Sequence, residues 1–154
     1  MRGVDRLARV LVLHGPNLNL LGEREQEIYG RKTLEQINSD LKEQGKAAGV
    51  EVVAFQSNHE GELIDKIHEA RGNFDVIILN PGALTHYSYA ISDAVRAVNI
   101  PVIEVHMSNI YSREPWRGKS VVAPAAYGQI SGFGEMSYRL ALAAACQLIN
   151  SKDP

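Results

Sequence analysis

The chain passes at Asp75-Val76-Ile77-Ile78-Leu79 from an apolar run straight into the polar cluster Asn80-Pro81-Gly82-Ala83-Leu84-Thr85-His86. A short run that is apolar on both faces is typical of a parallel strand buried between two layers of helices. In an open parallel sheet, the carboxyl ends of the strands meet at one edge, and ligands bind there. This stretch therefore predicts an α/β fold with its chemistry at the strand ends.

Three further apolar runs end in the same way. They lead into His14-Gly15-Pro16-Asn17, Ser57-Asn58-His59-Glu60 and Glu104-Val105-His106-Met107-Ser108-Asn109. Because these clusters follow parallel strands, we expect four of the five histidines and several asparagines to meet around one crevice. The pattern points to an enzyme that acts on a small molecule.

Five segments have the composition of buried strands, and segments with helical periodicity separate them. The expected strands are Ala8–Leu13, Val50–Phe55, Asp75–Leu79, Pro101–Val105 and Ser120–Ala123. Helices are expected around Leu34–Leu41, Leu63–Ile67, Ala90–Val98 and Glu135–Asn150. This alternation predicts a flavodoxin-like three-layer α/β/α fold with a five-stranded parallel sheet and right-handed crossovers.

Local signals refine the helices. Thr33-Leu34-Glu35-Gln36 has the pattern of a capping box, and Ser57 with Glu60 is a candidate for a second box. The expected final helix is apolar on nearly every side, so it is either buried on two sides or part of a subunit contact. A length of 154 residues fits one catalytic domain, residues 1–154, with a single core.

The bulk composition excludes several classes of protein. Hydrophobic residues make up 45% and charged residues 22%, as in ordinary soluble globular proteins, and the formal net charge of -2 favours neither nucleic acid nor an anionic membrane. The apolar runs are too short to span a bilayer, and the amino terminus lacks a signal-peptide pattern. The single Cys146 cannot form an internal disulfide. We therefore expect a cytoplasmic protein.

One long segment, Asn17–Lys32, follows the first expected strand and lacks periodicity. It is rich in charge and contains Gly22 and Gly30 as possible hinges. Loops of this length in compact domains are usually lids or binding loops. We expect this loop, about residues 17–32, to be a lid over the crevice.

Cofactor and metal motifs are weak. Gly132-Phe133-Gly134 lacks the third glycine of a dinucleotide-binding loop and follows the last strand, so it more simply opens a tight turn. There is no P-loop, and the first strand does not end in the acidic residues of a response regulator. The histidines and Glu104 could converge on zinc, but no histidine pair has helical ligand spacing and no cysteine accompanies them. We expect no metal.

Two pairs of residues suit proton transfer. Tyr29 lies on the expected lid with Arg24 nearby, and a guanidinium close to a phenol favours its phenolate. Glu104 and His106 are two residues apart on a strand, so they project from the same face. A carboxylate can hold an imidazole in the tautomer that delivers a proton.

Positive groups follow the fourth expected strand. Arg113 and Arg117 flank Pro115-Trp116, and guanidinium groups bind carboxylates bidentately, although solvated surface arginines remain an alternative. Ser108 and the backbone N–H groups around Met107 and Ser108 could cradle the same carboxylate. These residues indicate an anionic substrate.

Several motifs in this chain closely resemble those of type II 3-dehydroquinate dehydratase. They are Gly15-Pro16-Asn17-Leu18-Asn19-Leu20-Leu21-Gly22, Arg24 with Tyr29-Gly30, Ile78 to His86, Glu104 to Asn109, and Gly132-Phe133-Gly134-x-x-Ser137-Tyr138. They occur in order, from about Val10 to Ile149. The resemblance implies a cofactor-free enzyme that reversibly dehydrates 3-dehydroquinate to 3-dehydroshikimate by anti elimination through an enolate. It also implies a homo-oligomer, typically a dodecamer built from trimers.

The resemblance also implies roles for individual residues. Tyr29 matches the general base, Arg24 the lid arginine that favours its phenolate, His106 the general acid, Glu104 its orienting partner and Asn17 the residue that stabilises the enolate. Asn80, His86, Met107, Ser108 and Arg117 match substrate-binding positions. Arg113 matches a lid-contacting residue, and Asp93 matches a ring-binding aspartate that can come from a neighbouring subunit.

Two other classes stay open at this point. One is a non-catalytic carboxylate-binding module on the same fold, although a binder needs neither proton donor nor acceptor. The other is a metal-assisted lyase, which chelation would inactivate. One departure concerns the lid, which reads Arg24-Glu25-Gln26 where many relatives have proline after the glutamate. This change bears on the closure of the lid more than on the chemistry.

Overall fold

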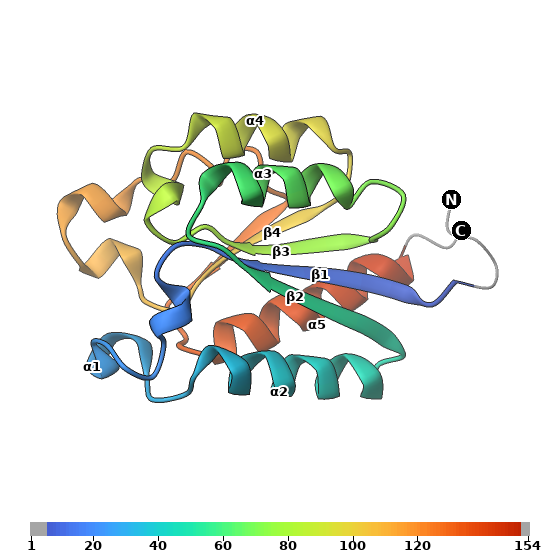
Figure 1. Cartoon of the computed structure of the whole chain (residues 1–154), viewed down its shortest axis with the longest axis horizontal. Helices are drawn as coiled ribbons and strands as arrows, with labels where there is room; N and C mark the ends of the chain where they lie inside the picture. The colour runs from blue at the N-terminus through green and yellow to red at the C-terminus, as the bar shows by residue number, and fades with distance from the viewer. Residues whose placement is uncertain (1–5, 152–154) are drawn as a thin grey trace.

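A computed structural model describes residues 6–151 as a parallel sheet between two layers of helices (Figure 1). The strand order is β2-β1-β3-β4-β5, which is the flavodoxin-like order that the sequence predicted. The strands are β1 (Ala8–His14), β2 (Val50–Gln56), β3 (Val76–Asn80), β4 (Val102–His106) and β5 (Gly128–Ser131). Every pairing between neighbouring strands is parallel.

Helices cover both faces of the sheet. In Figure 1, α3 (Glu60–Glu69) and α4 (Tyr89–Ala97) lie on one face, and α2 (Leu34–Ala47) and α5 (Met136–Ser151) lie on the other. Alternate strand residues enter two separate cores: Val10 and Val12 pack towards α2 and α5, whereas Leu11 and Leu13 pack towards α3 and α4. No helix within residues 6–151 is long and apolar enough to cross a membrane.

The capping prediction for α2 is confirmed, whereas the second box is wrong. Thr33 accepts from the backbone N–H of Gln36, and the Gln36 side chain accepts from the backbone N–H of Thr33. At α3 the N-cap is His59, and its side chain makes no capping bond. The hydroxyl of Ser57 instead accepts from the backbone N–H of His59 and donates to Glu62. Ser57 therefore stabilises the turn before α3 and does not form a capping box.

The predicted fifth strand at Ser120–Ala123 is also wrong. This segment forms turns, because the Ser120 hydroxyl accepts from the backbone N–H groups of Val122 and Ala123. Val122 is fully buried against the core on the α3 and α4 side, which explains its strand-like composition. The true edge strand, Gly128–Ser131, contains one large apolar residue and pairs only with β4, so its sequence signal is weak.

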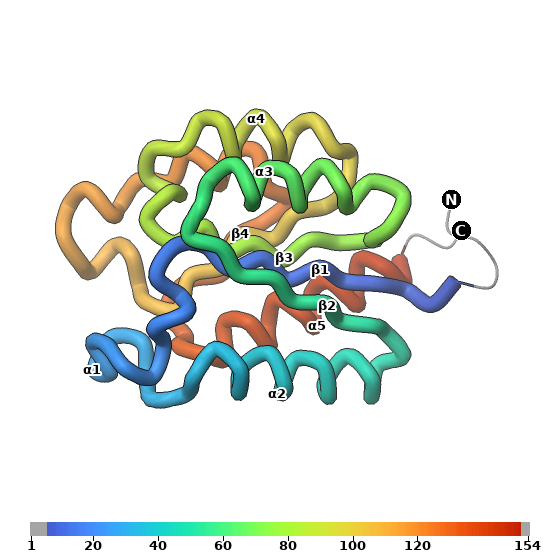
Figure 2. Tube along the Cα trace, viewed as in Figure 1, coloured from blue at the N-terminus to red at the C-terminus, as the bar shows by residue number. Residues whose placement is uncertain are grey.

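The carboxyl ends of the strands meet at one end of the molecule. In Figure 2 the loop after β1, with α1 (Gln26–Tyr29), and the loop after β4 lie at this end. The glycines predicted to open a tight turn do so: Gly132 (φ 98°) and Gly134 (φ 60°) join β5 to α5. The sheet thereby directs residues from distant parts of the chain to one edge.

Candidate active site

A cleft opens at this edge of the sheet, between the loop after β1 and the loop after β4. It holds about 650 Å³ of space between atoms, including its open mouth. Its lining comes from Pro16, Asn17, Leu18, Leu21, Arg24, Tyr29, Asn80, Gly82, Ala83, His86, His106, Met107, Ser108, Ile110, Arg113 and Arg117. A mostly preformed cleft with a few converging polar groups is the usual form of a small-molecule site.

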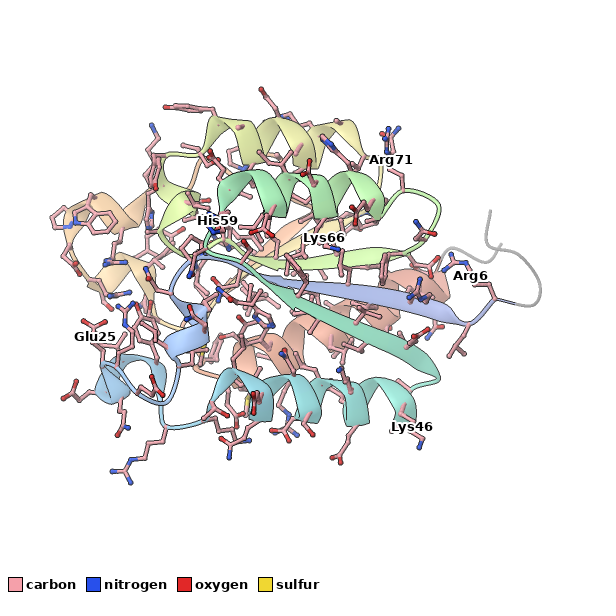
Figure 3. The ribbon with its side chains drawn as sticks, viewed as in Figure 1. Arg6, Glu25, Lys46, His59, Lys66 and Arg71 are labelled. Carbon is pink, nitrogen blue, oxygen red and sulfur yellow. The ribbon has the colours of Figure 1, made fainter. Side chains whose placement is uncertain are left out.

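The loop after β1 covers one side of the cleft. It carries the short helix α1, which ends in Tyr29, and Gly22 and Gly30 flank it with φ angles of 88° and 84°. Glu25 at the start of α1 also has a left-handed backbone, with φ 39°. Figure 3 shows Glu25 at the outer end of this loop, at the opposite end of the molecule from Lys46 and Arg71. Left-handed conformations at both borders set α1 apart as a discrete unit.

Two arginines surround the phenol of Tyr29. Arg113 donates from Nη1 to the phenol oxygen at 2.9 Å, and also to the Ser108 hydroxyl at 3.2 Å. The Arg24 guanidinium lies 5.2 Å from the centre of the tyrosine ring and forms an ion pair with Glu25. The Glu25 contact raises the pKa of Arg24, whose charge is therefore secure. The phenol of Tyr29 therefore lies close to two guanidinium groups.

His106 is tied to a buried carboxylate. Its Nε2 lies 2.5 Å from Oε2 of Glu104, and Glu104 also accepts hydrogen bonds from Thr85, Ser120 and Gln129. Burial opposes ionisation of Glu104, but the hydrogen bonds from His106 and its neighbours outweigh it and lower the carboxyl pKa. A carboxylate accepting at Nε2 puts a proton on that nitrogen. The prediction that Glu104 and His106 share one face is confirmed.

His86 is held in a single tautomer. Its Nδ1 lies 2.7 Å from the carbonyl oxygen of Lys119, and a carbonyl can only accept, so Nδ1 carries the proton. Burial lowers the pKa of His86 against the effect of this hydrogen bond. Trp116 packs edge-on against the imidazole. The neutral ring therefore has Nε2 as its acceptor, and His86 lines the cleft.

Asn17 lies on a strained turn at the end of β1. Its backbone is left-handed, with φ 72°, which is uncommon outside glycine but tolerated by asparagine. The side-chain oxygen of Asn58 accepts from the backbone N–H of Asn17 at 2.9 Å and also from Gln56 at 3.1 Å. The loop after β2 thereby supports the residue that lines the cleft.

Comparison with known proteins bears directly on this site. The family model described as dehydroquinase class II matches residues 8–146, which include every residue that lines the cleft. The chain belongs to the class II dehydroquinase family. A 3-dehydroquinate dehydratase of Caldicellulosiruptor bescii is 57% identical over 145 residues, covering 94% of this chain and 100% of the relative.

Solved structures of dehydroquinases share the fold. The type II dehydroquinase of Butyrivibrio crossotus has a TM-score of 0.89 and 48% identity, with 90% of this chain and 97% of that chain covered. The type II dehydroquinase of Propionibacterium acnes has a TM-score of 0.88 and 40% identity, covering 90% and 96%. This agreement confirms the predicted α/β architecture for this member of the class II dehydroquinase family.

The cleft of this class II dehydroquinase contains most of the predicted site residues. Those that line it are Asn17, Arg24, Tyr29, Asn80, His86, His106, Met107, Ser108, Arg113 and Arg117. Glu104 lies behind His106. Asp93 is exposed on α4 and does not line the cleft of its own chain.

The expectation that four histidines share the crevice is half wrong. His86 and His106 line the cleft, but His14 is buried beneath it and His59 has 77% of its side chain exposed at the start of α3. The end of a strand determines the edge of the sheet at which a residue lies, but the alternation of side chains along the strand determines the face to which it points. His14 points towards α2 and α5. No group of residues within 6–151 gathers three side chains suited to a metal.

Sequence reasoning missed the residues that support the site from behind. These are Asn58 beneath Asn17, the donors Thr85, Ser120 and Gln129 around Glu104, and Tyr138 beneath Asn80. Thr85 stood within a recognised polar cluster, and Ser120 was taken for the start of a strand. Tyr138 stood in a motif shared with the family, but its polar role gave no signal, because an aromatic residue at an apolar helix position usually packs in the core.

Proposed function

We propose that this chain reversibly dehydrates 3-dehydroquinate to 3-dehydroshikimate as a single catalytic domain, residues 1–154. The observation that carries the proposal is one cleft lined by both the Tyr29 phenol, contacted by Arg113, and the His106 imidazole, contacted by Glu104. These are a base and an acid with separate environments, which is what an elimination requires. The relatives named 3-dehydroquinate dehydratase support the same reaction.

The proposed elimination is anti and passes through an enolate. Tyr29, as phenolate, removes a proton from the carbon next to the ketone, and the electrons of that C–H bond move onto the carbonyl oxygen. Arg113 and Arg24 stabilise the phenolate beforehand. Asn17 stabilises the enolate oxygen, through an ordered water or directly, because a concentrated negative charge needs prepared donors.

Collapse of the enolate expels the hydroxyl group. The carbonyl re-forms, a carbon–carbon double bond appears in conjugation with it, and the C–O bond breaks as His106 protonates the leaving oxygen. Because Nε2 of His106 is engaged with Glu104, Nδ1 is the nitrogen available for this transfer. In this step His106 is an imidazolium with a proton on each ring nitrogen, and Glu104 stabilises that cation. In the reverse direction the neutral imidazole takes the proton back at Nδ1. Atoms and electrons balance without an oxidant, a reductant or a cofactor.

The remaining residues of the cleft bind the substrate in this proposal. Arg117, Ser108 and the backbone around Met107 bind its carboxylate, and Arg113 supports Ser108 by donating to its hydroxyl oxygen. His86 accepts from a ring hydroxyl through Nε2, while Asn80 contributes a polar contact from the end of β3. Closure of the loop at residues 17–32 excludes water from the reaction.

Assembly completes the proposal. We infer a dodecamer built from trimers, in which Asp93 on α4 contacts the ring of a substrate bound in a neighbouring subunit. Asp93 is exposed, as is Tyr89 on the same helix, and Met136 and Leu140 leave apolar surface exposed on α5. Such side chains mark a contact between subunits where they gather into one contiguous apolar patch. A cytoplasmic location fits the single cysteine.

The test is an ultraviolet assay of metal-free protein with 3-dehydroquinate, because the enone product absorbs and the substrate does not. We expect wild type to form product and Tyr29→Phe to lose turnover by orders of magnitude while still binding substrate. The matched control is Tyr127→Phe, an exposed tyrosine immediately before β5, at the end of the sheet away from the cleft. Wild-type turnover by Tyr29→Phe would overturn the assignment of the base.

Other outcomes of this assay identify the competing classes. A folded wild type that binds the substrate but forms no product would be a carboxylate-binding module. Activity that appears only when divalent metal is restored would identify a metal-assisted lyase. Sedimentation of the active protein gives the number of subunits, and a stable, active monomer would contradict both the dodecamer and the role of Asp93.

A further inference from the structure

A chain of buried polar side chains runs beneath the floor of the cleft. His14 at the end of β1 contacts the Tyr138 hydroxyl through Nδ1 at 2.9 Å and the Asn38 side-chain oxygen through Nε2 at 2.8 Å. The same hydroxyl accepts from Nδ2 of Asn80 at 2.9 Å. His14 and Tyr138 have no exposed surface, and Asn80 lines the cleft. These hydrogen bonds therefore connect α2, β1 and α5 to Asn80 at the end of β3, which lines the cleft.

The direction of every bond in this chain follows from one backbone donor. The N–H of Gly82 can only donate, and it does so to Oδ1 of Asn80 at 3.1 Å. The amide nitrogen of Asn80 therefore faces Tyr138, and the tyrosine oxygen accepts from it. The proton of the Tyr138 hydroxyl must then point to Nδ1 of His14.

The same logic determines the tautomer of His14. Because Nδ1 accepts, the proton of the neutral ring lies on Nε2 and is donated to Asn38. Burial lowers the pKa of His14 from 6.5 to about 4, against the opposing effect of Asn38, so the ring is neutral at pH 7. Each group in the chain then has one compatible orientation.

These orientations decide what Asn80 presents to the cleft. Its oxygen is occupied by Gly82 and one amide proton by Tyr138, which leaves the second amide proton for the cleft. We propose that Tyr138 and His14 are positioning residues that hold Asn80 as a hydrogen-bond donor to an oxygen of the substrate. This inference rests on the proposed function, since it concerns the same cleft. Without these hydrogen bonds, the side-chain amide of Asn80 can rotate and present its oxygen to the cleft. That oxygen would repel a carboxylate or carbonyl oxygen of the substrate.

The first test is a double-mutant cycle on the active enzyme. Tyr138→Phe removes only the hydroxyl, and we expect KM to rise about threefold to tenfold with a smaller change in kcat. In an Asn80→Ala background, the same substitution should change KM less than about twofold, because its effect passes through Asn80. Equal rises in both backgrounds would overturn the inference and indicate a packing role.

A control separates positioning from stability. The control is Leu142→Val. Leu142 lies one helical turn after Tyr138 in the same buried core, and its side chain has no polar atom. This substitution should lower the melting temperature but leave KM unchanged. If Tyr138→Phe does not fold, the pair His14→Gln and His14→Leu replaces it. Glutamine can still accept from Tyr138, so a KM equal to that of the leucine variant would count against the inference.

A second readout does not depend on activity. In protein with ¹⁵N-labelled histidine, long-range nuclear magnetic resonance spectra distinguish the two tautomers, and His14→Gln assigns the signal. We expect His14 to carry its proton on Nε2 and to stay neutral down to about pH 5. A proton on Nδ1 of His14, or titration of its ring near pH 6.5, would refute the proposed series of hydrogen bonds. An inactive wild type with the expected tautomer would instead refute the proposed function alone.

Discussion

Arg113 donates a hydrogen bond of 2.9 Å to the phenol oxygen of Tyr29, although 84 residues separate the two along the chain. The loop after β4 thus contacts the loop after β1 at the group we propose as the base. Arg24, the arginine that the family resemblance pairs with the phenolate, lies over the tyrosine ring and pairs with Glu25. In this conformation Arg113 is the cation in direct contact with the phenol oxygen.

The first prediction concerns Arg113. Arg113→Met should lower kcat by about tenfold to a hundredfold with a smaller effect on KM, because a hydrogen bond from a charged donor stabilises by about 1.5–3 kcal/mol. Steady-state kinetics against 3-dehydroquinate measures it. Arg117→Met is the matched comparison and should mainly raise KM, since we assign Arg117 to the substrate carboxylate. The opposite pattern would exchange the two roles.

Glu104 provides the second prediction. Glu104→Gln preserves the shape but removes the charge that holds His106, so kcat should fall at least about tenfold with KM nearly unchanged. Ser120→Ala removes one of several donors to the carboxylate and should cost much less. Kinetics of both variants, with circular dichroism to verify folding, tests this. Full activity in Glu104→Gln would show that His106 needs no carboxylate partner.

The third prediction is a pH dependence of stability caused by His14. Its pKa is lowered from 6.5 to about 4 in the folded state, so the unfolded chain binds this proton first as the pH falls. Stability should therefore decrease between about pH 6.5 and pH 4, by about 3 kcal/mol from this group. Urea denaturation at fixed protein concentration across this range measures the change. His14→Gln should flatten the profile, and an unchanged slope in that variant would contradict the assignment.

Two glycines provide the fourth prediction. A Cβ at Gly15 would lie 2.5 Å from the carbonyl oxygen of Pro81, so the backbone beneath the cleft must shift. Gly15→Ala should lose about 1–3 kcal/mol of stability and lower activity. Gly61 on α3 has open space around it, and Gly61→Ala should gain about 0.5–1 kcal/mol with activity unchanged. Thermal denaturation of both variants measures these changes. Equal changes in melting temperature would show that the close contact at Gly15 does not decide the effect of the substitution.

The fifth prediction concerns the support of Asn17. Asn58→Ala removes the acceptor for the backbone N–H of Asn17, whose left-handed conformation it stabilises. We expect kcat to fall severalfold and the melting temperature to change little, because the contact is exposed. His59→Ala, the exposed neighbour, is the control and should leave kcat unchanged. Equal kinetics in the two variants would show that Asn17 holds its position unaided.

Local patterns predicted much of the fold because their causes are local. Four of the strands and all of the longer helices lie where apolar periodicity and the Thr33 cap indicated, since burial of one face sets that periodicity. The prediction of the fifth strand was wrong because it too relied on apolar composition. Gly128–Ser131 has little apolar surface to bury at the sheet edge, whereas Val122 is buried from a turn.

The sequence by itself determined the α/β class, the edge of the sheet at which the polar residues gather, and the family, because motif order and strand ends are readable along the chain. Only the tertiary structure decided which side chains meet. It placed Arg113 on Tyr29, and it placed His14 beneath the floor with Tyr138, 124 residues away. Such contacts depend on strand order, on the face to which each side chain points and on the paths of the loops. No local period encodes these, since they arise when the separate layers pack.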